Sequence, residues 1–326
     1  MQEERIGVPV EFCYRHPSER TGVHCTRCGR PICPACMIPA PVGYQCPECV
    51  AQARKEFGQG PGRRVRAATG SITATKALLA AILVAFIAEV ATGGPTALMQ
   101  GPSIAKLVDL GALVPALVAR SGGLIGGIAG GQYWRFLTSM FLHIGLLHIA
   151  FNAWALWLFG TAMESALGTT RFLVVYFVTG FLAGVASYVF APIMVGSQFV
   201  GAQISLNIVA IGVPAAGASG AIFGVFGAFV AYNFRRRHLA QAAANLRWAM
   251  MMILLNALLA IGSSAIDWRA HVGGFVSGVA AGYIAEGFGP RRQRTVIAVA
   301  GFVALAAIGV VLTMYRTADI RSMLGL

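Results

Sequence analysis

The sequence has few charged residues: Asp, Glu, Lys and Arg together make up 11% of its 326 positions, whereas soluble globular proteins contain about 25%. This shortage excludes an ordinary soluble enzyme, a disordered protein and a free nucleic-acid-binding protein. The 57% share of hydrophobic residues and the mean hydropathy of +0.70 indicate a protein that crosses a membrane several times. The 40 glycines follow no three-residue period, so collagen is excluded as well.

Cysteine is missing from most of the chain, because all seven cysteines lie between Cys13 and Cys49. The first 70 residues also lack an apolar core segment, so they do not look like a secretory signal peptide. We therefore expect the N-terminus to stay in the cytosol, where thiols remain reduced.

Composition divides the chain into four parts. Residues 1–50 are polar and rich in Cys and Pro, and residues 51–75 form a basic linker rich in Gly and Ala. Residues 76–287 contain six predicted membrane spans, and residues 288–326 contain a seventh span and a short tail. The segment 93–135 is interrupted by Gly and Pro, so we expect it to form a structured loop at the membrane surface. The seven predicted spans, each near the ~20 residues that cross a bilayer, are 76–92, 136–160, 171–190, 215–234, 247–263, 269–287 and 295–315.

The basic residues predict how the chain is oriented. The net charge of +13 reflects arginines in short loops, and loops of this kind face the cytoplasm. Spans two, four and six then begin at the external face. Arginines beside a first span contact anionic lipid, so we expect the lipid bilayer as a partner and do not expect nucleic acid. The basic residues are Arg63, Arg64, Arg66 and Lys76 before span one, Arg171 before span three, Arg235, Arg236 and Arg237 after span four, and Arg291, Arg292 and Arg294 after span six.

The first 50 residues contain four pairs of metal ligands, each with two residues between its members. A tight turn of this kind lets both side chains reach one ion, and eight such ligands suffice for two tetrahedral zinc sites. Thiolate and imidazole ligands select zinc over calcium or magnesium. Disulfide pairing is a poor alternative in a cytosolic segment. The ligands are Cys13, His16, Cys25, Cys28, Cys33, Cys36, Cys46 and Cys49.

The order of these pairs resembles B-box-type and RING-like zinc fingers, in which the first pair joins the third and the second joins the fourth. Closed four-ligand sites are structural rather than catalytic, and a segment of about 50 residues depends on its metal for folding free energy. His24 competes with His16 for one ligand role. The spacing favours His16 and leaves His24 at the surface. We expect the finger to bind a cytosolic partner that the pattern does not name.

Span two carries three polar side chains. His148 and Asn152 are four residues apart, which places them on one helical face, and His143 lies about one turn before His148. Polar residues inside a membrane are costly and often mark function. Hydrogen bonding between helices is an alternative role for His and Asn.

Spans four and six carry matching stripes of small residues that follow Ser219 and His271. Such stripes let two backbones cross closely. Both spans run in the same direction, so the crossing would bring Ser219 and His271 to the same depth. A serine becomes a nucleophile beside a base, and His271 can supply that base. The stripe residues are Gly220, Gly224 and Ala228 in span four and Gly274, Gly278 and Gly282 in span six.

Together these motifs resemble the rhomboid family of intramembrane serine proteases over about residues 76–287. The resemblance implies an all-α polytopic membrane protein with a bundle of six transmembrane helices. The seventh span and the zinc-binding domain are additions to that bundle. In chain order the motifs are the Trp134-Arg135 pair, the set His143, His148 and Asn152, the group Glu164, Gly168, Arg171 and Phe172, GASG around Ser219, and AHxxGxxxG from Ala270 to Gly278.

The resemblance also implies an active site with a Ser–His dyad. Ser219 would be the nucleophile and His271 the general base. His148 and Asn152 would stabilise the oxyanion together with the backbone N–H of Ser219. Gly217 would let the substrate carbonyl approach closely.

The remaining roles follow from the same resemblance. His143 would be structural, and Phe223 would pack on His271 where many relatives have tyrosine. Asp267 lies four residues before His271, but the family uses no third residue, so we expect an external loop charge. The implied substrates are transmembrane segments of membrane proteins, cleaved near the external face. We expect the chain in a bacterial plasma membrane, with its N-terminus in the cytoplasm and the site open to the outside.

Two alternative functions fit less well. A non-catalytic relative that binds transmembrane helices would have lost Ser219 or His271, and both are present. A transporter or channel would need an ion relay, but among acidic residues Glu89 alone looks intramembrane, and the cysteines lie outside the spans.

Overall fold

The computed structural model describes residues 11–40, 43–58, 73–195, 198–199, 201–262, 266–287 and 293–326. The chain divides into two compact units, Met1–Ser71 and Ile72–Leu326, which are treated separately below. Most of the predicted linker 51–75 lies outside the described residues, as do Arg63, Arg64, Arg66, Arg291 and Arg292.

The N-terminal unit is small and has little regular structure. Two short antiparallel pairs join β1 (Glu11–Phe12) to β2 (Arg20–Thr21) and β3 (Ile38–Pro39) to β4 (Tyr44–Gln45). A single 3-10 turn covers Pro34–Cys36, and α1 covers Pro47–Gly58. The buried core consists of Ile32 and six of the seven cysteines. Thiols thus take the place that aliphatic side chains occupy in larger domains.

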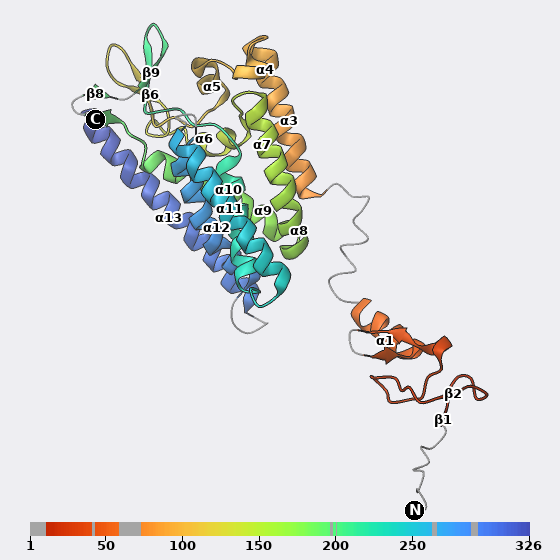
Figure 1. The fold of residues 1–326 in the computed structure, drawn as a ribbon. Helices are drawn as coiled ribbons and strands as arrows, with labels where there is room; N and C mark the ends of the chain where they lie inside the picture. Colours follow the sequence, from red (N-terminus) through yellow and green to blue (C-terminus); the bar gives the residue numbers. More distant parts are fainter. Residues whose placement is uncertain are drawn as a thin grey trace, which may run out of the picture. The chain divides into compact units, whose positions relative to one another are not determined.

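The second unit is a helical bundle (Figure 1). Among the described residues, five helical stretches are long and apolar enough to cross a membrane. The helix α10 is apolar but shorter, with 16 residues. The protein is therefore mostly helical and crosses the membrane several times. The long helices are α3 (Ala74–Gly93), α7 (Leu146–Ala155) continued through a π-helical turn (Leu156–Gly160) into α8 (Thr161–Leu167), α9 (Thr169–Val189), α10 (Ser219–Phe234), α11 (Ala240–Gly262), α12 (Trp268–Glu286) and α13 (Arg294–Met323).

The start of the second predicted span is wrong by ten residues. Residues predicted to open that span form the short helix α6 (Arg135–Thr138) and a 3-10 turn (Ser139–Phe141), and α7 begins only at Leu146. The physical reason lies at Gly145, whose φ of +83° interrupts the helical backbone. An apolar run continued across this break, so hydropathy alone did not reveal it.

The predicted loop 93–135 is structured, as expected, but it also contains strands that were not predicted. It holds α4 (Ala97–Gln100), α5 (Ile104–Leu110), β5 (Ala116–Ala119) and β6 (Leu124–Gly126). An antiparallel sheet in the order β6-β5-β10-β9 joins it to β9 (Gly201–Ser205) and β10 (Ile208–Ile211). A further pair is β7 (Met194–Val195) with β8 (Gln198–Phe199). Figure 1 shows the labelled strands β6, β8 and β9 at one end of the bundle.

The predicted close crossing of the two glycine stripes is confirmed. A Cβ placed on Gly274 would collide with the backbone oxygen of Gly220, and one on Gly278 would collide with that of Gly224. One on Gly282 would lie 2.8 Å from the Cα of Ala228. Residue numbers rise together along both helices, so α10 and α12 run in parallel. Side chains larger than hydrogen would push the two backbones apart.

Candidate functional site

Ser219 and His271 meet where α10 and α12 begin. Ser219 is the first residue of α10, and His271 lies in the first turn of α12. The distance from His271 Nε2 to Ser219 Oγ is 2.8 Å, which is a hydrogen bond. The parallel glycine crossing explains this placement, because it holds both N-terminal ends at one level.

The ring of His271 is held in place by an aromatic neighbour. Phe223 lies one turn after Ser219, and its ring stacks on the His271 ring with centroids 4.2 Å apart and planes 14° apart. Stacking of this kind limits rotation of the imidazole about its side-chain bonds. The position expected to pack on the histidine does so here.

Asp267 lies directly before α12, and its carboxylate is engaged by neighbouring groups. It is the N-cap of α12, and its side chain accepts a hydrogen bond from Ala270 N at 3.4 Å. The same carboxylate accepts a bond from the Ser187 hydroxyl and lies 3.3 Å from Arg269 Nε. Helix N-termini favour such caps. The carboxylate is therefore engaged in starting the helix and in holding α9.

His148 presents a protonated nitrogen toward Gly217. The Ile144 N–H donates to His148 Nδ1 at 3.1 Å, so Nδ1 is an acceptor and the ring proton lies on Nε2. A Cβ placed on Gly217 would lie 3.0 Å from His148 Nε2 and 3.6 Å from Ser219 Oγ. Gly217 thus separates the two side chains, and only hydrogen fits there.

Asn152 lies one turn beyond His148 on the same face of α7. Its Nδ2 donates to the backbone oxygen of His148 at 3.0 Å, and the residue is buried. The amide carries two N–H groups, so this bond leaves a second donor. The structure therefore brings Ser219, His271, His148 and Gly217 close to one another, and Asn152 contacts the backbone of His148.

His143 and Glu89 support the turn that precedes α7. His143 is fully buried, and its ring centroid lies 5.3 Å from that of His148. Its Nδ1 lies 3.0 Å from the backbone oxygen of Phe141, and its backbone N–H donates to both carboxylate oxygens of Glu89 at 3.0 Å. Glu89 thus satisfies the backbone N–H of His143 in the turn, which accounts for an acidic residue within the first span.

Arg135 holds the loop that follows the first span. Its Nη1 donates to the backbone oxygens of Val108 at 2.8 Å and Ala112 at 2.9 Å, and its Nε donates to Gln132 at 2.7 Å. The guanidinium also lies over the ring of Trp134, 4.6 Å from its centroid. The Trp134-Arg135 pair therefore positions the loop.

Sequence reasoning missed two residues beside the dyad. The backbone oxygen of Ser139 accepts a bond from Gly217 N at 2.8 Å, and Ser187 on α9 donates to Asp267. Both residues line a small cavity of about 40 Å³ that also touches Ser219. Burial is not visible in the sequence, and a serine within a span commonly serves helix packing, so neither residue stood out.

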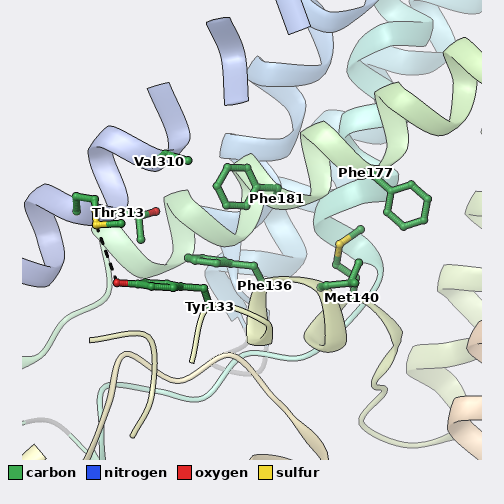
Figure 2. Close-up of a pocket in the computed structure, with 9 residues that line it drawn as sticks. Tyr133, Phe136, Met140, Phe177, Phe181, Val310 and Thr313 are labelled. Atoms are coloured by element: carbon green, nitrogen blue, oxygen red, sulfur yellow. Dashed lines mark hydrogen bonds between the residues drawn. The ribbon is translucent and has the colours of Figure 1, made fainter. Parts of the chain in front are cut away.

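A larger cavity of about 380 Å³ lies between the α6 segment, α9 and α13 (Figure 2). Its walls include Tyr133, Phe136, Phe181 and Thr313, with Met140 also bordering the small cavity at Ser219. The larger cavity contains neither member of the dyad. The small cavity is therefore the one that adjoins the candidate active site.

The metal ligands in the N-terminal unit group as the interleaved pattern predicted. One cluster contains Cys13, His16, Cys33 and Cys36, and the other contains Cys25, Cys28, Cys46 and Cys49. Within each cluster the ligand atoms lie within 4.8 Å of one another. His24 is exposed and pairs with Glu11, in agreement with its predicted place at the surface.

The distances within the clusters fit a tetrahedral metal ion. Zinc–sulfur bonds of about 2.3 Å place two sulfurs about 3.8 Å apart, and Cys28 Sγ lies 3.7 Å from Cys46 Sγ. His16 Nδ1 lies 3.3 Å from Cys33 Sγ and 3.5 Å from Cys36 Sγ. In addition, Arg30 donates to Cys28 and holds the pKa of that thiol at about 6, below the usual 9.0. A metal ligand must be a thiolate, and this hydrogen bond favours the thiolate form of Cys28.

Comparison with known proteins identifies a rhomboid domain over residues 130–287. The rhomboid protease GluP of Bacillus subtilis (strain 168) is 34% identical over 226 residues, which are 67% of this chain and 37% of that protein. The putative rhomboid protease YdcA of the same organism is 32% identical over 153 residues, 47% of this chain and 67% of that protein. The rhomboid protease AarA of Providencia stuartii is 31% identical over 160 residues, 45% of this chain and 54% of that protein.

The chain thus spans less than half the length of GluP and about two thirds of YdcA. The matched domain contains Ser219, His271, His148, Asn152 and Gly217, whereas the cysteine clusters lie outside it. The chain belongs to the rhomboid family.

Proposed function

We propose that this protein is an intramembrane serine endopeptidase that cleaves transmembrane segments of membrane proteins with a Ser–His dyad. The observation that carries the proposal is the 2.8 Å contact between Ser219 Oγ and His271 Nε2. A serine hydroxyl needs an adjacent base to attack a carbonyl. Family membership and the named rhomboid proteases among its relatives support the same reaction class.

Acylation is the first half of the reaction. Ser219 Oγ attacks the carbonyl carbon of the scissile peptide bond while His271 Nε2 takes the hydroxyl proton. As the C–N bond breaks, the imidazolium passes this proton to the leaving amine, and an acyl-enzyme remains.

Deacylation is the second half of the reaction. Water, deprotonated by His271, attacks the ester carbonyl carbon. The proton then passes from His271 to Ser219 Oγ as the acid product leaves.

The oxyanion of each tetrahedral intermediate needs hydrogen-bond donors. The backbone N–H of Ser219, the Nε2–H of His148 and the second amide N–H of Asn152 are the proposed set. His148 suits this role because the Ile144 N–H occupies its other nitrogen. Each donor in such a hole typically contributes about 3 kcal/mol to barrier reduction.

The dyad lies at the N-terminal ends of α10 and α12, and we assign these ends to the external face because basic loops favour the cytoplasm. Water reaches this end from outside, as hydrolysis requires. Substrate helices enter between span two (α7 and α8) and span five (α11), and they unwind there. Small or helix-breaking residues near the external end of a substrate helix therefore favour cleavage. We place the protein in a bacterial plasma membrane with its N-terminus in the cytoplasm.

The N-terminal unit binds two zinc ions in this proposal. Cys13, His16, Cys33 and Cys36 hold one, and Cys25, Cys28, Cys46 and Cys49 hold the other. Each site is closed by four protein ligands, so the ions would stabilise the fold and present a surface to a cytosolic partner. Catalysis needs no metal in this scheme, because the proposed dyad and oxyanion donors belong to the second unit.

Covalent labelling tests the protease assignment. The detergent-solubilised protein is treated with a fluorescent fluorophosphonate, which reacts with activated serines. We expect labelling of the wild type and its loss in Ser219→Ala and His271→Ala. Ser277→Ala serves as the matched control, because Ser277 on α12 donates to the backbone oxygen of Gly274 at 3.0 Å. We expect this variant to be labelled like the wild type.

Two outcomes decide between the functions. Label that depends on Ser219 and His271, together with cleavage of a single-span substrate, supports the protease. A folded wild type that takes no label and cleaves nothing contradicts the proposal and favours a non-catalytic rhomboid protein that binds transmembrane helices.

A further inference from the structure

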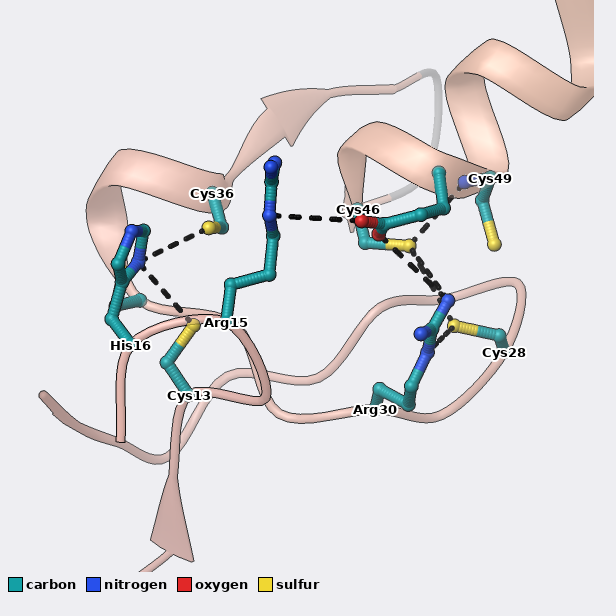
Figure 3. A network of polar contacts seen from close by, with 10 residues as sticks. Cys13, Arg15, His16, Cys28, Arg30, Cys36, Cys46 and Cys49 are labelled. Atoms are coloured by element: carbon teal, nitrogen blue, oxygen red, sulfur yellow. Dashed lines mark hydrogen bonds and ion pairs between the residues drawn. The ribbon is translucent and has the colours of Figure 1, made fainter. Parts of the chain in front are cut away.

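In the N-terminal unit, Arg30 contacts two sulfurs of one candidate metal-ligand cluster (Figure 3). Arg30 Nε donates to Cys28 Sγ at 3.3 Å, and Arg30 Nη2 lies 3.7 Å from Cys46 Sγ. Both sulfurs belong to the tetrathiolate cluster of Cys25, Cys28, Cys46 and Cys49. The planar guanidinium can direct two N–H groups at two acceptors at once, and it does so here.

The same guanidinium contacts a residue between two ligands of the cluster that contains His16. It lies over the ring of Tyr14, 4.3 Å from the centroid, and Tyr14 sits in the turn between the ligands Cys13 and His16. Arg30 also pairs with Glu48 at 3.8 Å, in the turn between Cys46 and Cys49. One side chain therefore bears on a ligand turn of each cluster.

Charge explains what Arg30 does for the tetrathiolate cluster. A divalent ion with four thiolates carries a net charge of about −2, whereas three thiolates and a neutral imidazole leave about −1. The more negative cluster gains more from a nearby cation, and N–H···S bonds to thiolates lower its charge density. Partners of this kind typically change metal affinity by 10–100-fold.

We propose that Arg30 is a positioning residue that stabilises metal in the tetrathiolate cluster and links the filling of that cluster to the filling of the Cys13, His16, Cys33 and Cys36 cluster. The inference rests on the proposed metal binding of the N-terminal unit. Arg30 contacts the tetrathiolate cluster through hydrogen bonds to sulfur, and it contacts the ligand turn of the other cluster through the ring of Tyr14. Metal at one cluster thereby fixes the side chain that supports the other.

Cobalt titration of the full chain in detergent tests the proposal. Co²⁺ replaces zinc in such sites, and its visible absorption bands differ between four-sulfur and three-sulfur-one-nitrogen ligation. In the wild type we expect both sets of bands to rise together. In Arg30→Met the four-sulfur bands should need 10–100-fold more free Co²⁺, while the other bands rise first.

Two further variants separate charge from general effects. Arg30→Lys keeps the positive charge but loses the planar guanidinium that donates to two sulfurs. We therefore expect an intermediate metal affinity at the four-sulfur site. Arg20→Met removes an arginine from β2 of the same unit and should match the wild type. The three-sulfur bands in Arg30→Met report whether the unit still folds around metal.

The outcomes distinguish the two hypotheses. A wild type without sulfur-to-cobalt absorption contradicts the proposed metal binding itself. A wild type that takes two equivalents, with Arg30→Met unchanged at both sites, leaves metal binding intact and overturns the role of Arg30. An equal loss at both sites also overturns it, because a general weakening of the unit would then explain the result.

Discussion

At the scale of single residues, the candidate site depends on small positions as much as on polar ones. Gly217 has a φ of +142°, a backbone conformation that side chains rarely adopt. It also separates His148 from Ser219. The polar residues identified from the sequence are brought together because a glycine leaves room between them.

Gly217→Ala should remove activity without unfolding the protein. The added methyl would lie 2.9 Å from His148 Cε1 and 3.0 Å from its Nε2, so the imidazole must move away from the oxyanion position. Loss of one such donor lowers kcat by about 10²–10³-fold. The measurement is the rate of fluorophosphonate labelling, alongside thermal unfolding in detergent.

Gly123→Ala is the matched control for backbone strain. Gly123 also has a positive φ, +95°, but no atom lies within 4 Å of a Cβ placed there. It should lose about 1–2 kcal/mol of stability and keep its labelling rate. Equal labelling of both variants and wild type would show that Gly217 does not set the His148 position.

At the scale of elements, the crossing of α10 and α12 decides where the dyad forms. Backbone contact between Gly220 and Gly274 and between Gly224 and Gly278 holds the two helices in register. The first turns of both helices then face each other, and the 2.8 Å contact between Ser219 and His271 follows. A shift of one helix by a single turn would move the two side chains about 5 Å apart.

Gly278→Ala should destabilise the bundle. The added Cβ would overlap the backbone of Gly224, and overpacking of this kind typically costs about 1–3 kcal/mol. We expect a melting temperature lower by about 2–10 °C and slower labelling of Ser219, because the helices must separate. Val276→Leu on the exposed side of α12 should change neither value, and a Gly278→Ala protein with wild-type stability would contradict the close crossing.

A second element-scale feature is the attachment of the first span. Glu164 in α8 accepts bonds from the backbone of Ala74 and Thr75 and from the hydroxyls of Thr75 and Thr169. This carboxylate satisfies the free N–H groups at the start of α3. A charged residue near the end of a span is thus explained by helix capping.

At the scale of the whole molecule, the chain contains two compact units with different sources of stability. The membrane unit packs apolar helices around glycine crossings, whereas the core of the N-terminal unit consists of Ile32 and cysteines. A core of this size is too small to fold on hydrophobic burial alone. Metal binding is therefore the expected source of folding free energy for the N-terminal unit.

Metal removal should separate the two units functionally. A strong zinc chelator should unfold residues 13–49 and expose them to a soluble protease, while Ser219 keeps its labelling rate. The measurement is limited proteolysis in parallel with fluorophosphonate labelling. A variant lacking residues 1–60 is the control: if the chelator abolished labelling even there, the metal would act outside the N-terminal unit and the separation would be wrong.

The sequence by itself determined the membrane class, the four pairs of candidate metal ligands and the dyad candidates, whereas the interleaved grouping of the pairs came from their resemblance to known zinc fingers. These conclusions follow from local chemistry: apolar length, ligand spacing and residues repeated at helical intervals. The stripes of small residues also predicted which helices would cross, because small residues along one face of a helix let a second backbone approach closely.

Only the tertiary structure decided how the supporting groups are used. The strands β5 and β10 come from segments about 90 residues apart, and no local pattern announces their pairing. Asp267 has the spacing of a triad member, yet its carboxylate caps α12 and bonds to Ser187. The start of α7 likewise depends on the backbone at Gly145. Hydrogen bonds that join distant segments fix these roles, because a buried polar group takes whichever partner the packed chain brings within reach.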